Sequence, residues 1–329
     1  MRAGVQAINA PQAAPANRLT THTPGPPIMP LRSLTPTAEV RSVALYRNFN
    51  SQEEIDREYN IESAVGDMRP YIEWFVGGSA RARAELACAL DVRFGPTLDE
   101  TLDIFPARRP DAPVLLFIHG GYWRLLSSKE FSLVARGPVA HDVTVVVMNY
   151  SLCPQVTIAE ITRQSRAAVA WIAANIASYN GDPQRLFVTG HSAGGHQVGM
   201  LVATDWVGDY GLPAMVIKGG IPISGLFDLR PFRHSWLQPK IQLDHDLIER
   251  QSPLFNIPML APPLLVTFGG DESAEFQRQS DDYVSAWRAR GHHATIFDQP
   301  GKNHLTAIAG FEDPASDLCR TVLDFIHAR

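Results

Sequence analysis

Residues 186–195 read LFVTGHSAGG, an apolar run that ends in a cluster of small residues. The run is typical of a buried strand, and Gly190-His191-Ser192-Ala193-Gly194 matches Gly-x-Ser-x-Gly where a helix should begin. A nucleophile elbow needs this context, because its tight turn raises the serine above the sheet edge. The next helix then points its N-terminus at that serine. The stretch predicts a nucleophilic Ser192 rather than an idle serine in a glycine-rich turn.

Similar apolar runs recur along the chain, separated by amphipathic segments. The expected buried strands are VLLFIH (114–119), VTVVVMNY (143–150), LFVTGH (186–191), MVIKGGIPIS (215–224) and PLLVTFGG (263–270). The expected helices are 158–179, 193–204, 275–290 and 314–327. Near-continuous apolar strands suit a parallel sheet covered on both faces, and their alternation with helices predicts a doubly wound α/β fold.

Two segments depart from this alternation. Residues 1–36 contain seven prolines among Ala, Thr and Asn, which predicts a disordered tail before a single domain at 37–329. Residues 225–262 break the strand–helix pattern with several prolines and the run RPFRHSW. We expect this insertion to form a small cap that lines a substrate site.

Composition and charge narrow the class of protein. The net charge of −5 and the lack of a basic block argue against nucleic acid or an anionic membrane surface as a partner. The three cysteines form no CxxC motif, and no apolar run has transmembrane length. The sequence also lacks HExxH, a phosphate-binding loop and a dinucleotide fingerprint. We therefore expect a cytoplasmic enzyme without metal or cofactor that acts on a small molecule. The oligomeric state stays open, and a homodimer is one option.

The stretch HGGYW at residues 119–123 follows an expected strand and predicts an oxyanion hole. Acyl transfer needs N–H donors aimed at the developing negative charge, and glycines let the backbone approach the substrate. We assign the donors to the backbone of Gly121, Tyr122 and Ala193, with Gly120 allowing the bend. Gly120, Tyr122 and Trp123 are expected to contact substrate, although core packing is nearly as good an interpretation of Trp123. His119 is expected to brace the loop.

A nucleophilic serine needs a base and an orienting carboxylate, in the chain order Ser, Asp or Glu, His. His304 follows the strand-like HHATIFD and precedes the last helix, which is where the base belongs. Asp271 leaves the strand PLLVTFGG first and is the preferred acid, with Glu272 as the adjacent alternative. Asp228 is the runner-up, but we interpret it as a structural residue of the cap that bonds Arg230.

Several motifs together resemble the kynurenine formamidase (arylformamidase) family of α/β-hydrolases over roughly residues 45–325. The motifs are HGGYW, NYSLCP, GHSAGGH, SGLFDLRPF, GGDESAEFQRQS and the His304 loop. The resemblance implies the α/β-hydrolase fold and a triad of Ser192, Asp271 and His304. It also implies hydrolysis of a formyl aryl amide such as N-formylkynurenine, a compound of tryptophan catabolism.

Two other functions stay open at this point. A carboxylesterase for short acyl esters would use the same serine machinery and differ only in its pocket. A catalytically inactive hydrolase fold that acts as a binding module is the alternative from another class. The intact set of serine, acid, histidine and oxyanion donors argues against inactivity.

Overall fold

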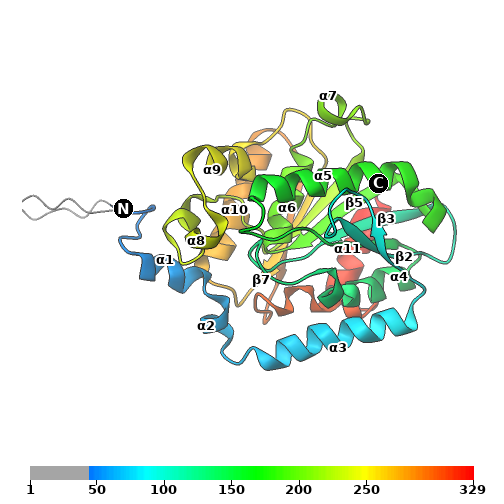
Figure 1. The fold of residues 1–329 in the computed structure, drawn as a ribbon, viewed down its shortest axis with the longest axis horizontal. Helices are drawn as coiled ribbons and strands as arrows, with labels where there is room; N and C mark the ends of the chain where they lie inside the picture. The colour runs from blue at the N-terminus through cyan, green and yellow to red at the C-terminus, as the bar shows by residue number, and fades with distance from the viewer. Residues whose placement is uncertain (1–43) are drawn as a thin grey trace, which may run out of the picture. The chain divides into compact units, whose positions relative to one another are not determined.

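The computed structural model describes residues 44–329, and these residues build an eight-stranded sheet (Figure 1). The strands are β1 (Ala89–Arg93), β2 (Thr101–Phe105), β3 (Ala112–Ile118), β4 (Thr144–Met148), β5 (Gly181–His191), β6 (Ile217–Ile223), β7 (Leu264–Gly269) and β8 (Ala294–Gln299). Their spatial order is β1-β2-β4-β3-β5-β6-β7-β8. β1 and β2 pair antiparallel, β2 also runs antiparallel to β4, and all later pairs are parallel.

Helices cover both faces of this sheet. The α-helices are α1 (Gln52–Tyr59), α2 (Ile61–Val65), α3 (Arg69–Glu85), α4 (Arg136–Ala140), α5 (Ile158–Asn175), α6 (Ala193–Val202), α7 (Trp206–Tyr210), α8 (Gln238–Ile241), α9 (His245–Gln251), α10 (Ala274–Ala289) and α11 (Asp317–His327). Short 3-10 helices are η1 (Ser128–Glu130), η2 (Ser132–Ala135), η3 (Ile176–Tyr179), η4 (Arg230–His234), η5 (Pro253–Phe255) and η6 (Thr306–Glu312).

Alternate side chains of the central strands enter two separate cores. Leu116 and Ile118 of β3 pack with α5, α6 and α10, whereas Leu115 and Phe117 pack with α3 and α11. Figure 1 shows α5 on one side of the sheet and α3 on the other. Every residue of β3 is buried, which is why this strand lacks a polar alternation in the sequence. The predicted doubly wound α/β sheet is therefore confirmed.

The predicted elements appear close to their expected positions. The segment 158–179 splits into α5 and η3, and α6, α10 and α11 cover most of the other three expected helices. The sequence analysis did not include β1, β2 or α3. The five residues of the edge strand β1 are half-buried or exposed, so the strand carries a weak hydrophobic pattern.

The two segments that were predicted to depart from the strand–helix alternation, residues 1–36 and 225–262, have different outcomes. The proline-rich tail at 1–36 lies outside the described residues. The expected cap at 225–262 connects β6 to β7 through η4, α8, α9 and η5 and contains no strand. One of its residues, Trp236, lines the cavity described below.

The junction from β5 to α6 depends on the absence of side chains. A Cβ at Gly194 would overlap the carbonyl oxygen of Ile118 and lie 2.9 Å from that of His119. A Cβ at Gly190 would lie 2.5 Å from the Gly194 carbonyl oxygen. The start of α6 therefore packs directly on the end of β3, where only glycine fits.

Gly194→Ala tests this close approach. We expect it to lower the free energy of unfolding by about 3 kcal/mol or more, because backbone must move to admit the methyl group. Gly77→Ala in α3 is the matched control: its Cβ would lie 3.6 Å from Arg81, an ordinary contact. That control should be neutral or gain about 0.5–1 kcal/mol. Urea unfolding measures both, and equal stability of the two variants would contradict the prediction.

Candidate active site

Ser192 occupies the turn between β5 and α6. Its φ of 57° and ψ of −115° are a strained backbone conformation for a residue with a side chain. The Ser192 N–H donates to the Ile223 carbonyl oxygen at 2.8 Å, which ties the turn to the end of β6. Ser192 is 2% exposed and lies at the wall of a cavity. These features are those of the predicted nucleophile elbow.

The HGGYW loop packs directly against this turn. A Cβ at Gly120 would lie 3.2 Å from the Cβ of Ser192, so a glycine lets the loop reach the serine. Gly121, Tyr122 and Trp123 all have positive φ, at 109°, 50° and 58°. Within residues 44–329, the N–H groups of Gly121 and Tyr122 donate to no protein acceptor. They are available to an oxyanion, as is the N-terminal N–H of α6 at Ala193.

His304 lies in the same cavity and pairs with a buried carboxylate. Its Nδ1 lies 2.7 Å from Oε2 of Glu272, and both side chains are nearly inaccessible to solvent. The other oxygen of Glu272 accepts from the Ser224 hydroxyl at 2.5 Å and from the Gly269 N–H at 2.6 Å. Three hydrogen bonds thus fix the carboxylate that orients the imidazole.

The structure corrects the expected acid, because Asp271 does not contact His304. The Asp271 N–H donates to the Lys302 carbonyl at 3.0 Å, and the residue is exposed. The chain turns at once, since the Glu272 N–H returns to the Gly269 carbonyl at 3.1 Å. This turn points the side chain of Glu272 back toward the sheet, so Glu272, the adjacent alternative, is the residue that pairs with His304. Leaving the strand first does not decide which side chain faces the site.

Two other histidines support the site. The Nε2–H of His191 donates to the carbonyl oxygen of His304 at 2.8 Å and holds the histidine loop against the elbow. Burial, together with the nearby His304, keeps the pKa of His191 well below its usual value. His119 donates from Nδ1 to the Gly120 carbonyl at 2.7 Å and stacks on Tyr150 with ring centroids 4.1 Å apart. His119 therefore braces the loop.

The cavity has a volume of about 610 Å³, within the usual range for small-molecule sites. Ser192 and His304 form part of its wall, with Gly120, Gly121 and Tyr122 beside them. Apolar residues dominate the remaining wall: Ile61, Met68, Ile72, Phe75, Leu125, Leu126, Phe131, Trp236 and Leu305. Glu62 and Arg124 supply the charged side chains other than histidine.

Trp123 does not line this cavity, so its expected contact with substrate is not supported. Its side chain is fully buried and its indole N–H donates to Nδ1 of His196 at 3.3 Å. His196 in turn donates from Nε2 to the Gln251 carbonyl at 2.6 Å. The Trp123 side chain therefore packs in the core and links the HGGYW loop to α6. This is the core-packing interpretation that the sequence analysis gave as the alternative.

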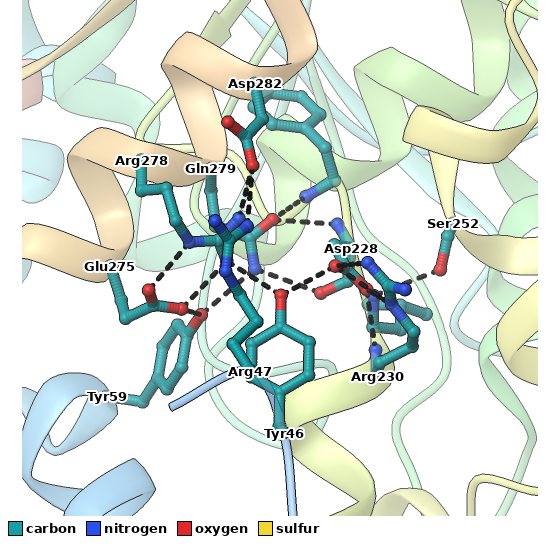
Figure 2. A network of polar contacts seen from close by, with 12 residues as sticks. Tyr46, Arg47, Tyr59, Asp228, Arg230, Ser252, Glu275, Arg278, Gln279 and Asp282 are labelled. Atoms are coloured by element: carbon teal, nitrogen blue, oxygen red, sulfur yellow. Dashed lines mark hydrogen bonds and ion pairs between the residues drawn. The ribbon is translucent and has the colours of Figure 1, made fainter. Parts of the chain in front are cut away.

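A buried polar network, missed by the sequence analysis, holds α1 beside the site (Figure 2). The Tyr59 hydroxyl donates to Glu275 at 2.9 Å and accepts from Gln279 at 3.1 Å, and both partners lie on α10. The Tyr59 carbonyl accepts from the Tyr122 hydroxyl at 2.5 Å. The oxyanion loop is therefore connected to α10, the helix that begins next to Glu272.

Asp228 belongs to the same network and has the structural role expected of it. The Nε and Nη2 groups of Arg230 donate to the Asp228 carboxylate, and the Tyr46 hydroxyl also donates to it at 2.7 Å. Burial opposes ionisation of Asp228, but the bonds from Arg230 and Tyr46 prevail and lower its pKa. The Gln279 amide accepts from the Asp228 N–H at 2.7 Å and so joins the 225–262 segment to α10.

Two further features of the described chain bear on cofactors and membranes. Within residues 44–329, no group of three or more His, Cys, Asp or Glu side chains is arranged to hold a metal ion. In the same residues, no helix is both long enough and apolar enough to cross a membrane.

Comparisons with known proteins agree with this geometry. The family model BD-FAE matches residues 102–209. The chain is 27% identical to a kynurenine formamidase of Danio rerio, over 84% of this chain and 97% of the relative. It is 28% identical to the esterase LipQ of Mycobacterium tuberculosis, over 67% of this chain and 57% of the relative. A crystal structure from Silicibacter sp., described as a candidate thioesterase, aligns with a TM-score of 0.72 and 28% identity, over 82% and 99% of the two chains.

The sheet, the elbow and the His304–Glu272 pair define an enzyme of the α/β-hydrolase fold, a serine hydrolase of the arylformamidase or esterase kind. An inactive binding module is not supported. Within that class, the chain is similar to kynurenine formamidases over most of its length, and this likeness supports the family that the sequence motifs implied.

The correction from Asp271 to Glu272 gives a direct test. Glu272→Gln should lower kcat for p-nitrophenyl acetate by about 10⁴-fold, because an amide no longer fixes the tautomer of His304 or stabilises its cation. Asp271→Asn, one residue away and equal in charge change, should stay within about twofold of wild type, because surface substitutions have small effects. A larger loss in Asp271→Asn than in Glu272→Gln would reverse the assignment.

Buried neutral histidines predict a loss of stability in acid. Burial lowers the pKa of both His119 and His196 to about 4, against about 6.5 in an unfolded chain. Between these values the unfolded state binds more protons, so stability is full above pH ~6.5 and falls as the pH falls toward ~4. Within that window, each histidine should lower the free energy of unfolding by about 1.4 kcal/mol for every pH unit of acidification.

Urea unfolding at pH 7 and pH 5 measures this slope. His196→Gln should lose about 1–2 kcal/mol less than wild type between the two pH values, because one titrating group is gone. His327→Gln, at an exposed position of α11, should keep the wild-type slope. A free energy of unfolding that is equal at pH 7 and pH 5 would be inconsistent with two neutral buried histidines.

Proposed function

We propose that the enzyme is an arylformamidase that hydrolyses N-formylkynurenine or a similar formyl aryl amide. One observation carries the proposal: a single cavity brings together Ser192, the HGGYW loop and a His304 that is bonded to Glu272. The kynurenine formamidase of Danio rerio matches almost along its whole length, which supports the same substrate class. A cytoplasmic location and a small-molecule substrate belong to the proposal.

In this proposal His304 acts as general base and Ser192 as nucleophile. Nδ1–H of His304 donates to Glu272, so Nε2 is left unprotonated to take the serine proton as the hydroxyl attacks the formyl carbon. Among the described residues no hydrogen bond joins Ser192 to His304 before substrate binds, and such bonds often tighten only in the substrate complex. The N–H groups of Gly121, Tyr122 and Ala193 receive the oxyanion.

The second half of the reaction returns the proton. An aryl amine is a poor leaving group as an anion, so His304 protonates its nitrogen as the carbon–nitrogen bond breaks. The formyl group then remains on Ser192 as an ester. Water, activated by His304, attacks this ester and releases formate, which restores the free serine.

An esterase for short acyl groups is the second candidate, and the wall of the cavity supports it. Most of the lining side chains are apolar, which suits an alkyl or aryl ester as well as a formyl amide. The match to the esterase LipQ favours the same alternative. The two candidates share their catalytic groups, so only substrate preference separates them.

The deciding measurement is kcat/KM for N-formylkynurenine beside p-nitrophenyl acetate and butyrate. We expect the formyl amide to be the better substrate, although its leaving group is worse, because its aryl group fills the cavity. Ser192→Ala should lower kcat for the amide by about 10⁴-fold or more. Turnover of the esters with negligible turnover of the amide would leave an esterase.

A further inference from the structure

Two residues of the cavity wall each carry a buried side-chain N–H donor that has no acceptor among residues 44–329. Nε of Arg124 and Nε1 of Trp236 are both inaccessible to solvent, and neither makes a hydrogen bond to residues 44–329. The guanidinium carbon of Arg124 lies 5.1 Å from the centre of the Trp236 ring. Both residues line the same cavity as Ser192. Buried donors without a partner are costly, so adjacent ones at a site indicate a missing acceptor.

We propose that Arg124 and Trp236 form a subsite for a carboxylate on the substrate, remote from the scissile carbonyl. This deepens the proposed function and rests on it: the formyl aryl amide or ester that the enzyme prefers carries an acid group. A carboxylate accepts hydrogen bonds on two oxygens and donates none, which matches two N–H donors of which one is cationic.

The charge of Arg124 is uncompensated in the described structure. The salt bridges among residues 44–329 do not include Arg124. Glu62 is the carboxylate that shares the cavity wall with it, but Glu62 is exposed and does not pair with it. A half-buried guanidinium without a counterion attracts an anion more strongly than one in water.

Both members of the subsite are held in place by the groups that build the active site. The backbone N–H of Arg124 donates to the Gly121 carbonyl at 3.0 Å, so the arginine lies in the same turn as the oxyanion loop. The backbone N–H of Trp236 donates to the Asp56 carboxylate of α1 at 2.9 Å, and the Trp236 ring packs edge-on against Tyr122 with ring centroids 5.6 Å apart. Loop and subsite are thus positioned together, as recognition of a substrate held at Ser192 requires.

A structural role alone does not account for these contacts. Stacking on the Trp236 ring would be enough to hold the Arg124 cation in place. It leaves Nε of Arg124 without a hydrogen-bond acceptor, however. A packing role would also be met by a lysine or an uncharged chain. A carboxylate ligand explains the stacking, which orients the guanidinium plane, and the two free donors together.

The test compares substrates that differ only in the acid. One is 4-(2-formamidophenyl)-4-oxobutanoate and the other is its neutral carboxamide, and both have the same formyl amide. For wild type we expect kcat/KM to be about 10- to 100-fold higher for the carboxylate, the range of a hydrogen bond to a charged group. A wild-type ratio near one would overturn the subsite.

Variants assign the preference to the two residues. Arg124→Gln should bring the carboxylate-to-carboxamide ratio to within about threefold of one, while Arg124→Lys should retain part of it. Trp236→Phe keeps the ring and removes the N–H, and it should lower the ratio by about three- to tenfold. Arg69→Gln is the charge-matched control: Arg69 is exposed and paired with Asp67, next to the cavity residue Met68, and its ratio should equal that of wild type.

Failure of the subsite and failure of the proposed function give different results. If formyl amides are cleaved but Arg124→Gln keeps the wild-type ratio, the formamidase stands and the subsite is wrong. If no formyl amide is cleaved, the ester pair 3-acetoxybenzoate and 3-acetoxybenzamide tests the subsite with the acid again on the leaving group. A preference for the benzoate that disappears in Arg124→Gln then supports the subsite without the formamidase, and equal rates overturn both.

Discussion

The close approach of α6 to the end of β3 is the constraint on which the site depends. Gly194 lies so near the Ile118 carbonyl that no side chain fits between them. Ser192 precedes this close contact directly, in a strained backbone conformation at the wall of the cavity. The close approach also brings the chain after β3 within reach of the serine, so the HGGYW loop can present its N–H groups there. Backbone packing thereby sets the geometry of two catalytic elements at once.

The remaining parts of the site are coupled to this elbow by buried hydrogen bonds. His191 holds the His304 loop from the elbow side, and Glu272 holds the imidazole from the end of β7. Through Tyr59, the network of Figure 2 connects the oxyanion loop to α10. These bonds lie where water is scarce, so each is stronger than at the surface and each unpaired group would be costly. The cavity is therefore pre-organised before substrate enters.

The sequence predicts the parts of this site that depend on local pattern. Ser192 and the HGGYW loop each follow a strand with a continuous apolar run, His304 follows the weaker strand pattern ATIFDQ, and the structure brings all three to one cavity. The choice between Asp271 and Glu272 depends instead on a turn that is closed by Lys302, far along the chain. Long-range contacts of this kind leave no periodic signal. The same reason explains why the role of Tyr59 was not predicted, and why Trp236 was expected at a substrate site only as part of the segment 225–262.

The residues that sequence patterns did not single out line the cavity and take no part in the bond-making steps. Trp236 comes from the irregular segment 225–262, and Arg124 follows the conformationally strained HGGYW turn. Neither position belongs to a strand or helix that fixes its direction, so their adjacency arises from the tertiary fold alone. The catalytic groups can thus stay constant among formamidases and esterases while such wall residues differ. In this protein the proposed preference for a carboxylate accordingly rests on two wall residues, Arg124 and Trp236, whose side-chain donors lack acceptors in the described structure.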